Sequence, residues 1–204
     1  MSEGLIYERI QGDYLIKCTK GIFQPKVTEF VANVYYNRRD FNFDLDYNSI
    51  LREMLDEDYK LKDDSTIYTI YNNYGNIIAT IRKIEAKKDS LLPIEREFNV
   101  DISSIVDEHG PVEKVYEIAR MATMVKDPDV FKTLLREGIY GCSKDDLFVA
   151  SLDSRVLRGL KRLGFPWFDL NEPKHYLGSL TCPVAVNVRD VNSKFIYDDL
   201  KLNV

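Results

Sequence analysis

A glutamate and an arginine, Glu117 and Arg120, stand three positions apart in the apolar segment VYEIARMATMV (115–125). A carboxylate can receive a proton, directly or through water, if burial raises its pKa. The segment predicts a β-strand, and residues three apart on a regular strand point to opposite faces. We therefore predict a β-bulge between the two residues, which would turn both side chains to one side. The alternative is that each residue forms a separate structural ion pair.

A second arginine, Arg82, lies among apolar residues in the predicted strand IIATIRKI (77–84). A charge at this place needs a carboxylate partner unless the strand end is solvated. The planar guanidinium could pair with Glu117, with Asp58, or with the carboxylate of a bound amino acid. A solvated arginine is the equal alternative.

A predicted helix over residues 154–163 presents four basic side chains, Arg155, Arg158, Lys161 and Arg162. The whole chain is acidic, with 28 Lys and Arg against 33 Asp and Glu and a net charge of −5. A basic face on such a chain suits docking of an acidic partner, with salt-sensitive binding. A solvated helix face is the alternative, and the net charge opposes a general role in coating nucleic acid.

Composition sets the class of protein. The chain has 204 residues with 45% apolar content, which predicts a single domain over 1–204. No apolar run approaches the roughly 18 residues that a membrane span needs, and no leader pattern opens the chain, so we expect neither export nor insertion.

The cysteines and histidines bear on the cellular compartment and on metal binding. Cys18, Cys142 and Cys182 are odd in number and far apart, which fits a reducing compartment and predicts a cytoplasmic protein. His109 and His175 have no second ligand at metal-binding spacing, so no metal site is expected.

Periodicity and turn residues predict the elements that position these side chains. Residues 66–72 and 77–84 flank a turn at 73–76 and predict an antiparallel hairpin. Residues 41–64 read as an irregular acidic surface segment that could order over a ligand. Further strands are expected at 13–19, 115–125, 146–152 and 183–188, a terminal element at 195–202, and helices at 27–40, 48–55, 102–106, 128–139 and 154–163. This order predicts an α+β fold around a mixed sheet.

Two motifs carry a resemblance to a known family. The first is Glu117-Ile-Ala-Arg120, and the second is Arg158-Gly-Leu-Lys-Arg-Leu-Gly-Phe165. The chain from about Arg38 onward, most specifically residues 115–165, resembles the acyl-homoserine-lactone synthases and N-acyl amino acid synthases of the GNAT superfamily. Their strand motif is Glu-x-x-Arg, and a later helix carries an Arg-rich segment. Arg82 matches their hairpin arginine, and Asp56-Glu-Asp58 approximates their acidic cluster.

The resemblance implies an N-acyltransferase with a GNAT-like, mostly antiparallel sheet flanked by helices and splayed central strands. Glu117 and Arg120 would organise the amine acceptor as catalytic residues, while Arg82, Asp56 and Asp58 would orient it. Two strand segments would hold the donor thioester: Met121, Ala122, Thr123 and Met124, and Phe148, Val149, Ala150 and Ser151. The basic helix face would dock an acyl carrier protein.

One departure bears on the donor. The glycine-rich phosphate loop of acetyl-CoA-dependent members is replaced by Met124-Val-Lys-Asp-Pro128. Without glycines, backbone N–H groups cannot approach a pyrophosphate closely. This favours a carrier-protein phosphopantetheine thioester over acyl-CoA as co-substrate, with no tightly bound cofactor. The alternatives are an acyl-CoA or acetyl-CoA transferase and a non-catalytic acyl-binding module. The sequence leaves open the amine, the acyl length and the oligomeric state.

Overall fold

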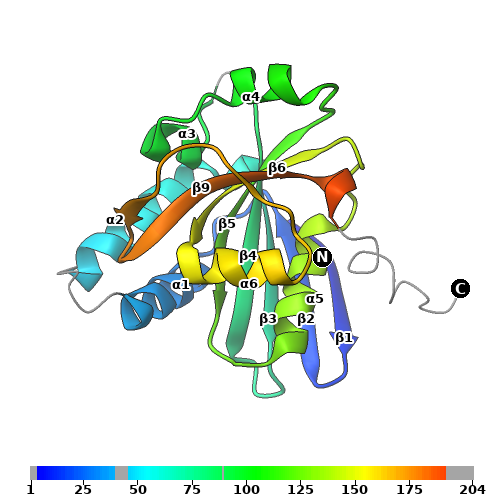
Figure 1. Cartoon of the computed structure of the whole chain (residues 1–204). Helices are drawn as coiled ribbons and strands as arrows, with labels where there is room; N and C mark the ends of the chain where they lie inside the picture. The colour runs from blue at the N-terminus through cyan, green and yellow to red at the C-terminus, as the bar shows by residue number, and fades with distance from the viewer. Residues whose placement is uncertain (1–3, 40–45, 89, 192–204) are drawn as a thin grey trace, which may run out of the picture. The chain divides into compact units, whose positions relative to one another are not determined.

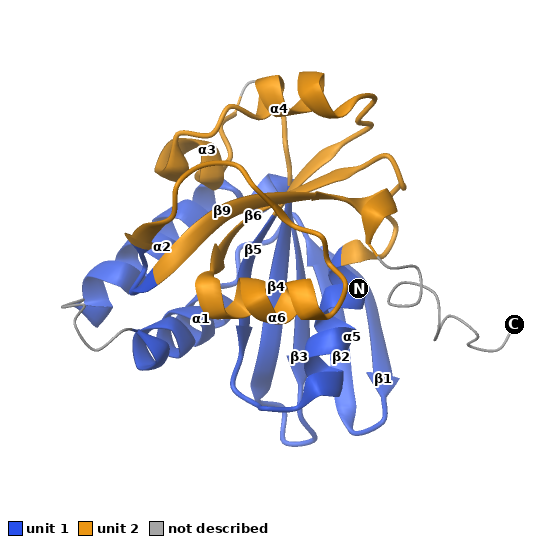
Figure 2. Ribbon diagram, in the orientation of Figure 1, with its two compact units in different colours: residues 1–84, 118–138, 176–179 blue, residues 85–117, 139–175, 180–204 orange. Residues whose placement is uncertain are grey.

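The computed structural model describes residues 4–39, 46–88 and 90–191, and the chain divides into two compact units (Figures 1 and 2). Unit 1 contains residues 1–84, 118–138 and 176–179; unit 2 contains residues 85–117, 139–175 and 180–204. The units take alternate stretches of the sequence, so several strands pass from one unit into the other. The single domain over 1–204 stays a prediction.

Unit 1 is built on an antiparallel sheet in the order β1 (Leu5–Gln11), β2 (Tyr14–Lys20), β3 (Ser65–Tyr71) and β4 (Ile77–Glu85). The predicted strand at 13–19 and the predicted hairpin are confirmed. In the hairpin turn the Asn72 side-chain oxygen accepts the N–H groups of Tyr74 and Asn76, each at 3.0 Å. Gly75 has a φ of 78°, a conformation that glycine adopts without strain.

Three helices accompany this sheet: α1 (Pro25–Arg38), α2 (Tyr47–Lys60) and α5 (Pro128–Ile139). Buried residues of α1 and α2 form one apolar core with Ala122. The helix predicted at 48–55 within the acidic segment 41–64 is confirmed, but it is longer than predicted, since α2 runs without a break from Tyr47 to Lys60. The helix begins where the Asp46 carboxylate accepts the Ser49 N–H at 2.9 Å. Residues 40–45 lie outside the described residues.

Strand β5 (Val115–Thr123) begins in unit 2 and ends in unit 1. The Glu113 N–H donates to the Asp145 carbonyl and the Leu147 N–H to the Lys114 carbonyl, each at 2.9 Å within unit 2. Because the partners advance together along both segments, the chain entering β5 runs parallel to the chain entering β6 (Leu147–Asp153). Both strands were predicted. The splaying of the central strands further along involves both units and stays a prediction.

The rest of unit 2 surrounds β9 (Ser179–Asn187), which pairs antiparallel with β6 and β7 (Phe168–Asp169) and also pairs with β8 (Lys174–Tyr176). Its helices are α3 (Pro93–Phe98), α4 (Ile102–His109) and α6 (Ser154–Arg162). The predicted cap of α6 is confirmed, because the Asp153 carboxylate accepts the Arg155 N–H at 2.7 Å. The terminal element predicted at 195–202 lies outside the described residues.

The fold is therefore α+β, with a mostly antiparallel sheet and flanking helices, as predicted. Within the described ranges, no helix combines the length and the apolar character that crossing a membrane requires.

Candidate functional site

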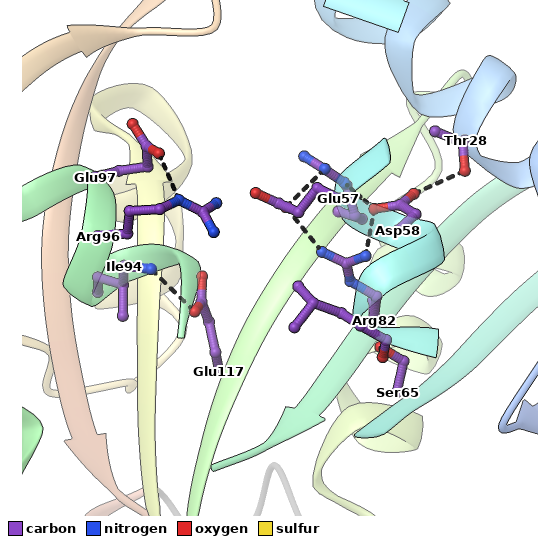
Figure 3. Close-up of polar contacts among 11 residues, drawn as sticks. Thr28, Glu57, Asp58, Ser65, Arg82, Ile94, Arg96, Glu97 and Glu117 are labelled. Carbon is purple, nitrogen blue, oxygen red and sulfur yellow. Dashed lines mark hydrogen bonds and ion pairs between the residues drawn. The ribbon is translucent and has the colours of Figure 1, made fainter. Parts of the chain in front are cut away.

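Two arginines and two carboxylates meet inside unit 1 (Figure 3). We call Glu57, Asp58, Arg82 and Arg120 the arginine–carboxylate cluster. Glu57 and Asp58 come from α2, Arg82 from β4 and Arg120 from β5. Asp58 Oδ1 accepts from Arg120 Nε at 3.0 Å and also pairs with Arg82, while Glu57 Oε1 lies 2.8 Å from Arg120 and 3.3 Å from Arg82. Thr28 of α1 donates its hydroxyl to the other Asp58 oxygen at 2.7 Å.

The cluster is nearly closed to solvent. The exposed fractions of the side chains are 2% for Arg82, 8% for Arg120, 11% for Glu57 and 12% for Asp58. Buried charges are tolerated only when they are paired, and here two positive and two negative charges balance. Of the partners predicted for Arg82, Asp58 is confirmed.

The charges set the protonation states. Burial favours the neutral form of Asp58, but the guanidinium groups of Arg120 and Arg82 outweigh it and lower the pKa of this carboxyl group. Burial likewise disfavours the charged form of Arg120, yet the carboxylates of Asp58 and Glu57 prevail and raise the pKa of the guanidinium. Asp58 and Arg120 therefore both stay charged near neutral pH.

The backbone at Arg120 is unusual. Its φ is 53°, in the left-handed region that non-glycine residues avoid at a cost of about 1–2 kcal/mol. A residue held in such a conformation inside a strand is often part of a functional site. The strained conformation belongs to the same residue that the Glu-x-x-Arg motif singled out.

Strand β5 also contains the extra residue of a β-bulge. The Met124 N–H donates to the Ile78 carbonyl, and the Ala86 N–H donates to the Val115 carbonyl. Between these two hydrogen bonds lie seven residues of the β4 chain, 79–85, and eight of the β5 chain, 116–123. One strand therefore carries one residue more than its neighbour, which is the definition of a bulge. The extra residue lies within 116–123; that the bulge falls between Glu117 and Arg120, and that it turns both side chains to one side, stay predictions.

Glu117 lies in unit 2 and is 2% exposed. Its Oε2 accepts the backbone N–H of Ile94, at the start of α3, at 3.1 Å (Figure 3). Helix α3 was not predicted from the sequence, so this contact was not foreseen. An N–H donor fixes the orientation of the carboxylate, which a proton acceptor in a reaction requires.

A hollow in unit 1 opens beside the cluster. It measures about 340 Å³ when the space open to solvent is included, but only about 10 Å³ admits the centre of a water molecule, which is room for one. Polar and apolar side chains line it. They are Ile22, Phe23, Gln24, Val27, Thr28, Val31, Asp58, Lys62, Ser65, Ile67, Thr80, Arg82 and Arg120.

The other predicted site residues lie apart from the cluster or in unit 2. Asp56 is exposed on α2, and Glu57 contacts the arginines beside Asp58. Met121–Met124 are at the end of β5 in unit 1, whereas Phe148–Ser151 belong to β6 in unit 2. A thioester slot between these two segments would draw on both units, so that assignment stays a prediction.

The basic face predicted on α6 is exposed at all four positions, Arg155, Arg158, Lys161 and Arg162. Arg155 pairs with Asp153 at 2.6 Å, and Lys161 lies 4.0 Å from Asp169. For Arg158 and Arg162, which are one helical turn apart, the described part of the chain provides no ion-pair partner. Elsewhere among the described residues, no group of three His, Cys, Asp or Glu side chains is arranged to hold a metal ion.

No protein-family model and no curated protein matches the sequence, but solved structures match its fold. FeeM, an N-acyl amino acid synthase from uncultured soil microbes, is similar with a TM-score of 0.61 and 15% identity over 92% of this chain and 95% of FeeM. BjaI, a CoA-dependent acyl-homoserine lactone synthase solved with SAM and isopentyl-CoA, gives a TM-score of 0.59 and 11% identity over 88% and 84%. FdhC, a nucleotide-linked sugar GNAT, gives 0.54 and 8% over 97% and 99%. These matches confirm the GNAT-like fold.

Proposed function

We propose that this chain is an N-acyltransferase that moves an acyl chain from a thioester to the amine of an amino acid or a similar small acceptor. The observation that carries the proposal is the arginine–carboxylate cluster, with its strained Arg120, on a fold shared with an N-acyl amino acid synthase and a lactone synthase. A fold alone hosts many activities, so the cluster is the stronger part of the argument.

The reaction requires a neutral amine, a proton acceptor and donors for the developing oxyanion. The amine nitrogen attacks the thioester carbonyl carbon, a C–N bond forms, and the C–S bond breaks. Glu117 receives the proton that the amine loses, and the departing thiolate takes up a proton to leave as a thiol. Glu117 suits this role because its carboxylate is buried and oriented by the Ile94 N–H.

The cluster has a different role in this scheme. Arg120 and Arg82 are held by two carboxylates each, so they are fixed in place. Fixed groups lose little conformational freedom when a ligand binds, which favours affinity. We assign the cluster to the orientation of the acceptor, with Asp58 as the carboxylate that both arginines share.

We assign the donor to an acyl carrier protein, and the exposed Arg158 and Arg162 of α6 support this choice because carrier proteins are acidic. Acyl-CoA is the second candidate, which the likeness to the CoA-dependent BjaI favours. The reaction is placed in the cytoplasm, since an odd number of cysteines fits a reducing compartment.

A product assay tests the proposal. The protein is incubated with long-chain acyl-carrier protein or acyl-CoA and a pool of amino acids, and N-acyl products are sought by mass spectrometry. Glu117→Gln should lower kcat by at least about 100-fold, the usual contribution of a general base, because glutamine can still accept the Ile94 N–H but cannot take up the proton. Glu113→Gln, an exposed glutamate four residues earlier, should leave kcat unchanged.

A second comparison separates the two donors. Arg158→Glu with Arg162→Glu should raise KM for the acyl-carrier protein and leave KM for acyl-CoA unchanged, whereas Lys132→Glu on α5 should change neither. Absence of any N-acyl product with both donors would refute the enzyme assignment and favour a binding module. Equal rates for Glu117→Gln and the parent would remove Glu117 from the mechanism.

A further inference from the structure

One of the three guanidinium nitrogens of Arg82 has no hydrogen-bond acceptor among the described residues. Its two terminal nitrogens bind Asp58 and Glu57, but its Nε lies buried with no hydrogen-bond acceptor among the residues that the structure describes. The residue is 2% exposed, so bulk water does not reach the group. Buried donors are nearly always paired in folded proteins, and an exception calls for an explanation such as a bound molecule.

The hollow beside Arg82 can hold that molecule. Arg82 lines it, and its closed part has room for one water molecule or for one small polar head group of comparable size. Five apolar side chains, Ile22, Phe23, Val27, Val31 and Ile67, make up another part of the lining. A ligand here would combine an oxygen acceptor at one end with an apolar body.

The charges around the hollow select among acceptors. Arg82 and Arg120 are balanced by Asp58 and Glu57, which leaves the positive charge of Lys62 in the lining. Lys62 Nζ donates to the Tyr59 carbonyl at 3.5 Å and lies 3.6 Å from the exposed Asp63 and 4.3 Å from the Tyr59 ring; these are long contacts at a partly exposed group, so it can turn toward a ligand. One carboxylate would neutralise this charge, whereas an ammonium group would add to it.

We propose that the hollow is a subsite for a small monocarboxylate with an apolar body. The ligand carboxylate accepts the Arg82 Nε–H, and Lys62 supplies the balancing charge. The apolar body lies against the five apolar side chains, and Phe23, whose ring meets the half-exposed Tyr59 edge-on at 5.5 Å, moves to admit it. The identification of the ligand carboxylate as that of the acceptor molecule, whose amine receives the acyl chain, rests on the proposed function.

Binding can be measured without turnover. Isobutyrate is titrated into the whole protein while the arginine Nε–H signals are followed by ¹H–¹⁵N NMR, and the Arg82 signal is assigned from its loss in Arg82→Lys. The signal should shift saturably with isobutyrate. Isobutyramide, which has the same shape without the charge, should bind about tenfold more weakly, because hydrogen bonds to charged groups are roughly twice as strong.

Two matched variants test the counter-charge. Lys62→Gln should weaken isobutyrate binding about three- to fivefold, as expected for one partly exposed charge, and Lys60→Gln, an exposed lysine outside the lining, should not. An Arg82 signal that does not move, equal binding of acid and amide, or equal effects of the two lysine variants would each overturn the proposal.

The outcome is separable from that of the acyl-transfer assay. Isobutyrate binding without any N-acyl product would leave the subsite standing and sink the enzyme assignment. If acyl transfer occurs but isobutyrate neither shifts the Arg82 signal nor raises KM for the acceptor, the enzyme assignment stands and the subsite is refuted.

Discussion

Replacing Asp58 by asparagine should destabilise the protein because it unbalances the arginine–carboxylate cluster. Asp58 accepts hydrogen bonds from both arginines and from Thr28, and it is 12% exposed. Without its charge, Arg82 and Arg120 share the single carboxylate of Glu57. Breaking a buried ion pair costs about 3–5 kcal/mol, and the slight exposure places the expected loss near the lower end, about 3 kcal/mol.

Urea unfolding followed by circular dichroism measures this loss. A decrease of about 3 kcal/mol corresponds to a fall in Tm of roughly 6–12 °C for a chain of this size. Asp56→Asn is the matched control, because Asp56 lies two residues earlier on α2 and is exposed. It should change the free energy of unfolding by less than about 0.5 kcal/mol.

A compensating change isolates the charge balance from the loss of a side chain. Adding Arg82→Gln to Asp58→Asn leaves one arginine and one carboxylate, so the double variant should be more stable than the sum of the single effects predicts, by about 1–3 kcal/mol. Strict additivity, or equal effects of Asp58→Asn and Asp56→Asn, would refute the view that charge balance holds this region together.

Three further predictions concern the same region and one concerns the β3–β4 turn. Arg120→Gly should be more stable than Arg120→Ala by about 1 kcal/mol in urea unfolding, because both lose the ion pairs but only glycine accepts a φ of 53° freely. Thr28→Val should cost about 1–2 kcal/mol, and Thr28→Ser should restore most of it, since the hydroxyl donates to a buried carboxylate. The lowered pKa of Asp58 means that, as pH falls, the unfolded chain takes up the proton before the folded chain does. The stabilising effect of the Asp58 charge is therefore complete above about pH 4 and is lost below it. The difference between the urea midpoints at about pH 6 and at about pH 3 should accordingly be smaller for Asp58→Asn than for the parent. Gly75→Ala should lower the free energy of unfolding by about 1 kcal/mol, and Gly75→Asn should lower it less, because asparagine tolerates the φ of 78°. Equal losses in the two variants would contradict the role given to the Gly75 backbone conformation.

The elements that sequence patterns predicted are those whose signals are local. The β3–β4 hairpin follows from β-rich runs around Asn and Gly, and α6 follows from an apolar stripe with Asp153 as its cap. Strand β1 was not predicted because its residues are mostly exposed, so it has no buried face that would require alternating apolar and polar residues. Strands β7 and β8 have two and three residues and exist through pairing with the distant β9.

Glu57 could have been found from helical periodicity. Ile50 and Met54 are buried on α2, and continuing the same stripe by three and four residues reaches Glu57 and Asp58, whereas Asp56 falls outside it. Predicting the helix only to residue 55 cut the stripe short. The left-handed conformation of Arg120 could not be predicted from the sequence, because that conformation is typical of glycine and asparagine and not of arginine.

The strain at Arg120 and the pairing of its side chain belong together. A left-handed arginine costs about 1–2 kcal/mol, which two buried carboxylates can offset only while both keep their charge. Side chains from α2, β4 and β5 thus hold one another in place, and Thr28 of α1 closes the set. Changes within the cluster should therefore alter folding stability and acceptor binding together. Changes on the exposed face of α6 should alter donor binding alone, because no side chain of that face takes part in the cluster.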